Sequence, residues 1–115
     1  MPHIRSLSVE PARVSPAEAV VVVRVELEPG AAAVEVRGRL VGPKCEGVST
    51  VEVAYPLRPE PGGDAGLSLR AVVPEPNLWS PGSPFRYDGR VEVWAGGRRV
   101  EVREFAVELR ASSPQ

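Results

Sequence analysis

The stretch of sequence that decides the fold is Pro76-Asn77-Leu78-Trp79-Ser80-Pro81-Gly82-Ser83-Pro84-Phe85-Arg86-Tyr87. It contains three prolines within nine residues and one of the two tryptophans of the chain. Each proline removes a backbone donor and restricts φ, so the run can form neither a helix nor a central strand. We therefore expect an ordered loop that crosses between strands, with Trp79 as its anchor.

Outside this loop, apolar and polar residues alternate, which indicates strands and not helices. We expect strands over residues 4–9, 19–27, 33–41, 48–57, 66–73, 87–95 and 98–109. Gly96-Gly97 can adopt the positive φ of a tight hairpin turn between the last two. Short strands at roughly ten-residue spacing, each with one apolar face, predict an all-β fold in which two sheets pack together.

The alternation also predicts the direction of individual side chains. In the strand expected over residues 48–57, Val51, Val53 and Tyr55 should share the buried face. Along the last strand Val102 and Phe105 fall on opposite parities, so we expect a β-bulge near Arg103-Glu104. Five glutamates are expected to point outward and to pair with arginines such as Arg24, Arg37 and Arg90: Glu26, Glu35, Glu52, Glu92 and Glu101.

The composition is that of one globular domain. The chain has 115 residues, 43% hydrophobic and 25% charged, and we expect a single domain over residues 1–110 and a short polar tail over 111–115. The net charge is −1 with the signs interleaved, which predicts no nucleic-acid partner. The aliphatic run over residues 19–23 is far shorter than the about 20 residues that span a bilayer, so no membrane partner is expected.

A single cysteine, Cys45, excludes an internal disulfide and a cysteine-based zinc site. Together with the lack of an export signal in this sequence, it makes a cytoplasmic location the default expectation. Export after removal of a signal absent here stays open as the alternative.

The tryptophan loop resembles a known family. Leu78-Trp79-Ser80-Pro81, followed by Pro84, an aromatic residue and Tyr87 at the start of an alternating strand, resembles the immunoglobulin-like sandwich domain of family 2 glycoside hydrolases, the β-galactosidase and β-glucuronidase group. The resemblance covers residues 16–110 and implies an immunoglobulin-like sandwich with a non-catalytic, bracing role. It also implies a structural motif at one end of the sandwich, and the hydroxyl of Tyr87 is expected to bond back to the backbone. The motif residues are Leu78, Trp79, Pro81, Pro84 and Tyr87.

Two departures from the family pattern are visible. Arg86 stands where the family has an aliphatic residue, and Phe105-Ala106-Val107-Glu108 stands where the family has Phe-Gly-aliphatic-Arg before its catalytic barrel. We therefore expect either a separate subunit or an excised domain. The catalytic glutamates of the family lie in the barrel and are not expected here.

No catalytic, cofactor or metal site is predicted. His3 is the single histidine and has no partner for a metal or a triad, and Cys45 beside Lys44 is expected to be an exposed, inert thiol. Gly62-Gly63-Asp64 lacks the following helix of a phosphate loop and is expected to form a turn.

Trp94 is the residue that points to a contact. On the outer face with Arg90, Glu92 and Arg99 it would form a contact surface, because indoles are favoured at protein interfaces. The alternative is that Trp94 covers the end of the core beside the Gly-Gly turn.

Three functions follow as hypotheses. The first is a non-catalytic module that gives structural support or assembles with a protein partner, either a carbohydrate-active enzyme subunit or a second copy. The alternative is a small carbohydrate-binding module that holds a polysaccharide through Trp94. The third, a hydrolase in its own right, is disfavoured because no acid/base pair can be assembled.

Overall fold

The computed structural model describes residues 4–28, 34–60 and 67–111. These residues form seven antiparallel strands, as predicted: β1 (Ile4–Val14), β2 (Glu18–Leu27), β3 (Val34–Lys44), β4 (Val53–Pro59), β5 (Leu67–Pro74), β6 (Arg86–Ala95) and β7 (Arg98–Val107). No helix that could span a membrane occurs in the described part of the chain.

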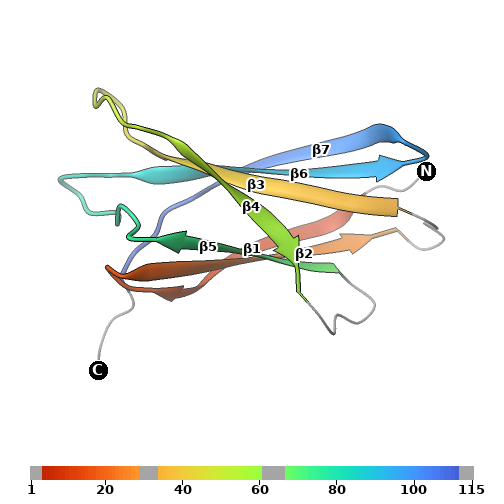
Figure 1. Ribbon diagram of the computed structural model, residues 1–115, viewed down its shortest axis with the longest axis horizontal. Coiled ribbons are helices and arrows are strands. Elements are labelled where there is room, and N and C mark those ends of the chain that lie inside the picture. The colour runs from red at the N-terminus through yellow and green to blue at the C-terminus, as the bar shows by residue number, and fades with distance from the viewer. Residues whose placement is uncertain (1–3, 29–33, 61–66, 112–115) are drawn as a thin grey trace.

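The strands follow one another by hydrogen bonding in the order β1-β2-β5-β4-β3-β6-β7. β1, β2 and β5 belong to one layer, sheet A, and β3, β6 and β7 belong to the other, sheet B. β4 connects them, since Val53–Leu57 pair with β3 and Arg58 and Pro59 pair with β5. Figure 1 shows β4 running obliquely between the two groups of strands. The fold is the predicted all-β sandwich, with one strand shared between its sheets.

The core lies between the inner faces of the two sheets. Val21, Val23 and Val25 of β2 share the core face, as predicted, although Val20 and Val22 between them are also buried, at 5% and 7% exposed. Core-facing residues of β5 and β6 are buried as well. The core includes Leu69, Ala71 and Val73 of β5, Tyr87, Val91 and Val93 of β6, and Leu40, Leu57, Val107 and Leu109 from their neighbours.

The hairpin of β6 and β7 turns at Gly96-Gly97, where φ is +59° and +77°, as predicted. The bulge was predicted near Arg103-Glu104, and that position is wrong. The register shifts beside the turn, where Trp94 faces Arg99 but Val93 faces Glu101. This early shift brings Phe105 opposite Gly89, where a Cβ would collide with the phenylalanine ring.

The same shift reverses the direction of Glu101. We predicted an outward side chain, but Glu101 faces Val93 on the core side of β7. There its Oε1 accepts a 2.7 Å hydrogen bond from the backbone N–H of Ile4, and Arg103 donates to the Ile4 carbonyl at 3.1 Å. The pair Glu101 and Arg103, joined at 2.8 Å, therefore fastens β7 of sheet B to β1 of sheet A.

Two strands run beyond the predicted ends at residues 9 and 41, and each contains a proline in the added part. β1 continues through Pro11 to Val14, because it is an edge strand and its register shifts between Pro11 and Arg13. β3 continues past Gly42 to Lys44, with an irregularity between Val41 and Lys44 that accommodates the proline.

β4 begins five residues later than the sequence suggested, at Val53 instead of Val48. The N–H of Val48 bonds to the carbonyl of Cys45 at 3.1 Å in a tight turn, and pairing with β3 starts only at Gly42 and Val53. Val51 and Val53, expected in the core, are 86% and 45% exposed.

Candidate contact surface

The tryptophan loop is ordered by the end of the chain that follows β7. The backbone N–H of Trp79 donates to the carbonyl of Leu109 at 2.8 Å, and the guanidinium of Arg110 lies 3.6 Å from the centre of the Trp79 ring. Ser80 and Ser83 exchange two backbone hydrogen bonds of 3.1 and 3.0 Å. Of the other motif residues, Leu78 packs against the core, whereas Pro81 and Pro84 are exposed and stiffen the turn.

Tyr87 has the predicted role. The residue is 1% exposed, and its hydroxyl accepts a 2.9 Å hydrogen bond from the backbone N–H of Asn77, at the start of the loop. Burial raises the pKa of the Tyr87 phenol, with the hydrogen bond from Asn77 acting in the opposite direction. The tyrosine corner is thus present and ties the loop to β6.

Trp94 lies on the outer face of sheet B and is partly buried by polar neighbours. Its indole N–H donates to Glu92 Oε1 at 3.0 Å, and the guanidinium of Arg37 lies 4.4 Å from the ring centre, within cation–π range. One face of the indole is therefore already occupied by a side chain of the neighbouring strand β3.

Glu92 is the centre of this group. Its side chain is 15% exposed and contacts Arg99 at 3.3 Å and Arg90 at 3.7 Å as well as the indole. The hydrogen bond from Trp94 lowers the pKa of Glu92, Arg99 and Arg90 contribute in the same direction, and burial opposes them. The structure thus brings together all four residues that the sequence singled out, Arg90, Glu92, Trp94 and Arg99, which we call the Trp94 cluster.

The Trp94 cluster has little unused charge. Arg90 also contacts Glu104 at 3.1 Å, and beside it Arg37, Gly38, Arg39, Arg90 and Glu92 line a shallow hollow of about 260 Å³. Glu92 and Glu104 both contact Arg90, at 3.7 and 3.1 Å.

The other glutamates predicted to pair with arginines have partners of different kinds. Glu35 pairs with Arg37 of its own strand at 2.9 Å, Arg24 pairs with Glu10 of β1, and Glu26 contacts the hydroxyl of Ser6. Lys44 lies 3.7 Å from Glu52 and also contacts Asp88 at 3.2 Å.

Two further predictions concern reactive groups. Cys45 is partly buried, and its Sγ lies 3.8 Å from the carbonyl oxygen of Glu46. His3, Gly62-Gly63-Asp64 and the tail from residue 112 lie outside the described residues. Within the described ranges no three metal-ligating side chains gather.

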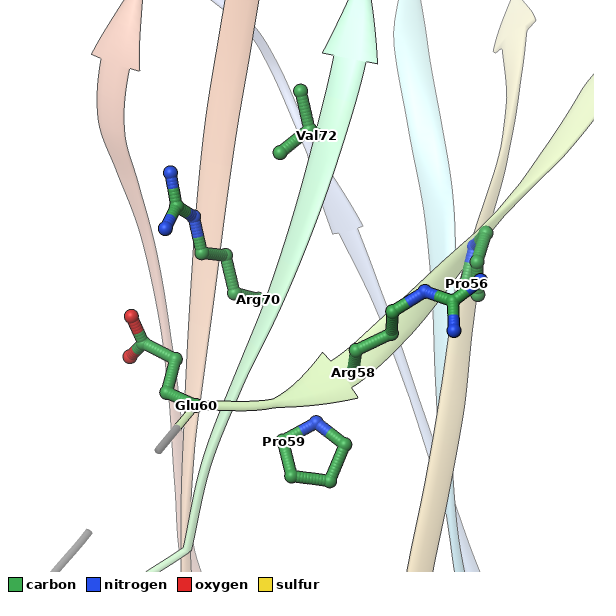
Figure 2. Close-up of a pocket in the computed structure, with 6 residues that line it drawn as sticks. All are labelled: Pro56, Arg58, Pro59, Glu60, Arg70 and Val72. Carbon is green, nitrogen blue, oxygen red and sulfur yellow. The ribbon is translucent and has the colours of Figure 1, made fainter. Parts of the chain in front are cut away.

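A second hollow was missed by the sequence analysis. Where β4 leaves sheet B to join sheet A, a pocket of about 460 Å³ opens beside β5. The strand predicted over residues 48–57 stops before Arg58, but Arg58 and Pro59 belong to β4 and pair with Arg70 and Leu69. We call this the β4–β5 pocket, drawn in Figure 2; it is lined by Pro56, Arg58, Pro59, Glu60, Arg70 and Val72.

The family assignment follows from the whole chain and not from either hollow. The sequence profile described as "Glycosyl hydrolases family 2" matches residues 2–110. The chain belongs to this family. The resemblance inferred from the tryptophan loop is thereby confirmed.

Solved structures agree with the fold. A β-glucuronidase from Bifidobacterium dentium, solved with coumarin-3-O-glucuronide, superposes with a TM-score of 0.63 and 18% identity, over 94% of this chain and 18% of its own. A glycosyl hydrolase family 2 member from Bacteroides cellulosilyticus gives a TM-score of 0.58 and 14% identity, over 94% of this chain and 15% of its own. The chain thus spans less than a fifth of the length of either enzyme. A comparison with curated protein sequences gave no match.

Proposed function

We propose that this domain is a non-catalytic β-sandwich module that braces or assembles with the catalytic part of a family 2 glycoside hydrolase. The observation that carries the proposal is the family match over residues 2–110 of a chain that corresponds to less than a fifth of two structurally similar enzymes. We therefore expect no glycoside cleavage by a unit of this size alone.

The chemistry of the described carboxylates supports the same proposal. Glycoside cleavage needs a carboxylic acid with a raised pKa beside a second carboxylate. Glu92 and Glu35 have lowered pKa values, in each case chiefly because a side-chain hydrogen bond, from Trp94 or Arg37, favours the charged form. Glu101, which faces the core side, is held by the backbone of β1 and by Arg103.

The test is co-expression of the tagged domain with a family 2 catalytic barrel from the same source organism. We expect the two proteins to elute together as a complex, and the isolated domain to leave 4-nitrophenyl β-glucuronide and β-galactoside uncleaved. Separate elution would contradict the bracing role, and turnover by the isolated domain would contradict its non-catalytic character.

The carbohydrate-binding alternative has less support. Sugar-binding indoles offer a flat open face, whereas Arg37 covers one face of Trp94 and Glu92 holds its N–H. We expect no change in tryptophan fluorescence across a panel of polysaccharides. Quenching that disappears in Trp94→Ala would favour the sugar-binding function instead.

A further inference from the structure

The β4–β5 pocket contains two arginines for which no ion pair occurs among the described residues. Arg58 and Arg70 are opposite each other in the β4–β5 register, which brings two like charges to one site, although their long side chains diverge. Among the described residues, no carboxylate forms an ion pair with either guanidinium. Glu60, the acid among the described lining residues, accepts a 2.6 Å hydrogen bond from the hydroxyl of Ser68.

The two guanidinium groups lie on opposite sides of the pocket. Figure 2 shows the side chain of Arg58 running toward Pro56 and the side chain of Arg70 running away from it, with Val72 farther along β5. Val72 is 42% exposed, and Pro56 and Pro59 add further apolar surface. A ligand that matches this surface has two anionic groups with an apolar group between them.

The backbone around the pocket is also incomplete. The N–H of Glu60 donates to the carbonyl of Ser68 at 2.8 Å, so the antiparallel alternation makes Arg58 and Arg70 the next hydrogen-bonding pair. Two residues farther along the ladder, the next hydrogen-bonding pair would be Pro56 and Val72. That pair does not form, because proline has no N–H and because β4 pairs with β3 at Pro56. The N–H and C=O of Val72 are thus directed toward the pocket, where Pro56 cannot complete the ladder.

An exposed strand edge of this kind binds an extended peptide through its backbone, while alternate side chains provide selectivity. Pro56 and Pro74 at the two strands limit the edge to a short segment and protect it from pairing with any long strand. A segment with acidic, apolar and acidic residues at alternate positions carries all three on one face. Laid across β5 and β4, it would direct its two carboxylates toward the guanidinium groups on either side of the pocket and its apolar side chain toward Val72.

We propose that the β4–β5 pocket binds a short, extended polypeptide segment of a partner, whose carboxylates pair with Arg58 and Arg70 and whose apolar side chain covers Val72. Charge complementarity favours an acidic partner. The whole chain has a net charge of −1, so the positive charge of Arg58 and Arg70 is confined to this pocket. The inference is independent of the bracing function, since any protein with such a segment could occupy the pocket.

The experiment measures fluorescence anisotropy of a labelled peptide, Glu-Thr-Val-Thr-Glu with blocked ends, titrated with the purified chain. Arg70→Glu or Arg58→Glu should weaken binding by roughly tenfold or more, because a charge-assisted hydrogen bond is lost and a repulsion is added. The matched control is Arg39→Glu, which makes the same change in net charge on sheet B and should leave affinity within about twofold. The neutral peptide Gln-Thr-Val-Thr-Gln should not bind detectably.

A single variant could lose affinity only because it is less stable. Reversing the charges of both the pocket and the peptide tests binding without that ambiguity. The double variant Arg58→Glu, Arg70→Glu should bind Lys-Thr-Val-Thr-Lys and no longer bind the acidic peptide, which only a folded pocket can do. Equal losses in Arg39→Glu and Arg70→Glu, or equal binding of the neutral peptide, would overturn the proposal. Binding of polygalacturonate that depends on Arg70, without binding of the peptide, would also overturn it and assign the pocket to an acidic polysaccharide. If the peptide binds but the catalytic barrel does not co-elute with the domain, the pocket proposal stands and the bracing function fails.

Discussion

Two pairs of arginines face each other across neighbouring strands, Arg39 with Arg90 in sheet B and Arg58 with Arg70 where β4 joins sheet A. In sheet B the repulsion is compensated, since Arg90 contacts both Glu92 and Glu104. In the β4–β5 pocket, no described carboxylate forms an ion pair with Arg58 or Arg70. The comparison teaches that like charges placed opposite each other on neighbouring strands can be compensated by carboxylates of the same sheet, as in sheet B, or can lack such a contact among the described residues, as in the β4–β5 pocket.

The largest expected effect comes from removing the acid that satisfies the Trp94 cluster. Glu92→Ala should lower the free energy of unfolding by about 1–3 kcal/mol, because it leaves the partly buried indole N–H and two arginines without their shared acceptor. Glu104→Ala is the matched control. Its carboxylate is 69% exposed, so its loss should cost about 0.5 kcal/mol or less. Urea denaturation followed by circular dichroism measures both, and equal losses would contradict the distinction between the two acids.

The pH dependence of stability should come next in size. The pKa of Glu92 is lowered in the folded state from its ordinary value of 4.5, so its stabilising contribution is complete above that value and is lost as the pH falls through the lower, folded pKa. Replacement by glutamine should flatten the stability profile in that acidic window and leave its slope at neutral pH unchanged. Parallel profiles of the wild type and Glu92→Gln at acidic pH would show that the cluster does not depend on this charge.

The two arginine pairs should respond with opposite signs when one member is neutralised. Arg90→Gln removes two ion pairs and should destabilise the domain by about 0.5 kcal/mol. Arg70→Gln removes a repulsion and should stabilise it by a few tenths of a kcal/mol, roughly the size of a cross-strand like-charge pair. Thermal unfolding at low ionic strength measures the sign, and destabilisation by Arg70→Gln would mean that the pair has a structural partner.

The smallest effect concerns screening. Raising the sodium chloride concentration weakens interactions between exposed charges, so it should relieve the repulsion between Arg58 and Arg70 in the wild type but not in Arg70→Gln. We expect the stability difference between these two proteins to narrow by roughly a few tenths of a kcal/mol at high salt. A difference that stays constant with salt would indicate that packing, and not charge, separates them.

Some features of the domain could be predicted from local sequence because one strand or one turn determines them. The buried alternation of Val21, Val23 and Val25 needs only the period of a strand, and Gly96-Gly97 needs only a turn with positive φ. The hydroxyl of Tyr87 was expected to bond to the backbone, and it accepts from Asn77. The residues of the Trp94 cluster share a face for the same reason, although their ion pairs depend on neighbouring strands.

Other features depend on which strand lies alongside, and here the local pattern was misleading. Val51 alternates correctly with its neighbours but has no strand partner, so it is 86% exposed. The β-bulge lies beside Trp94 and not at Arg103-Glu104, because the register follows the tight turn. Glu101 consequently faces the core side and joins the two sheets.

The sequence by itself determined that this chain is an all-β member of glycosyl hydrolases family 2, with an ordered tryptophan loop and one apolar face on most strands. Those properties follow from side-chain period, proline geometry and a family motif, each of which is written in contiguous residues. Only the tertiary structure decided that β4 changes sheets and that Arg58 meets Arg70. The pairing of strands distant in sequence depends on register and on hydrogen bonds that no local pattern encodes.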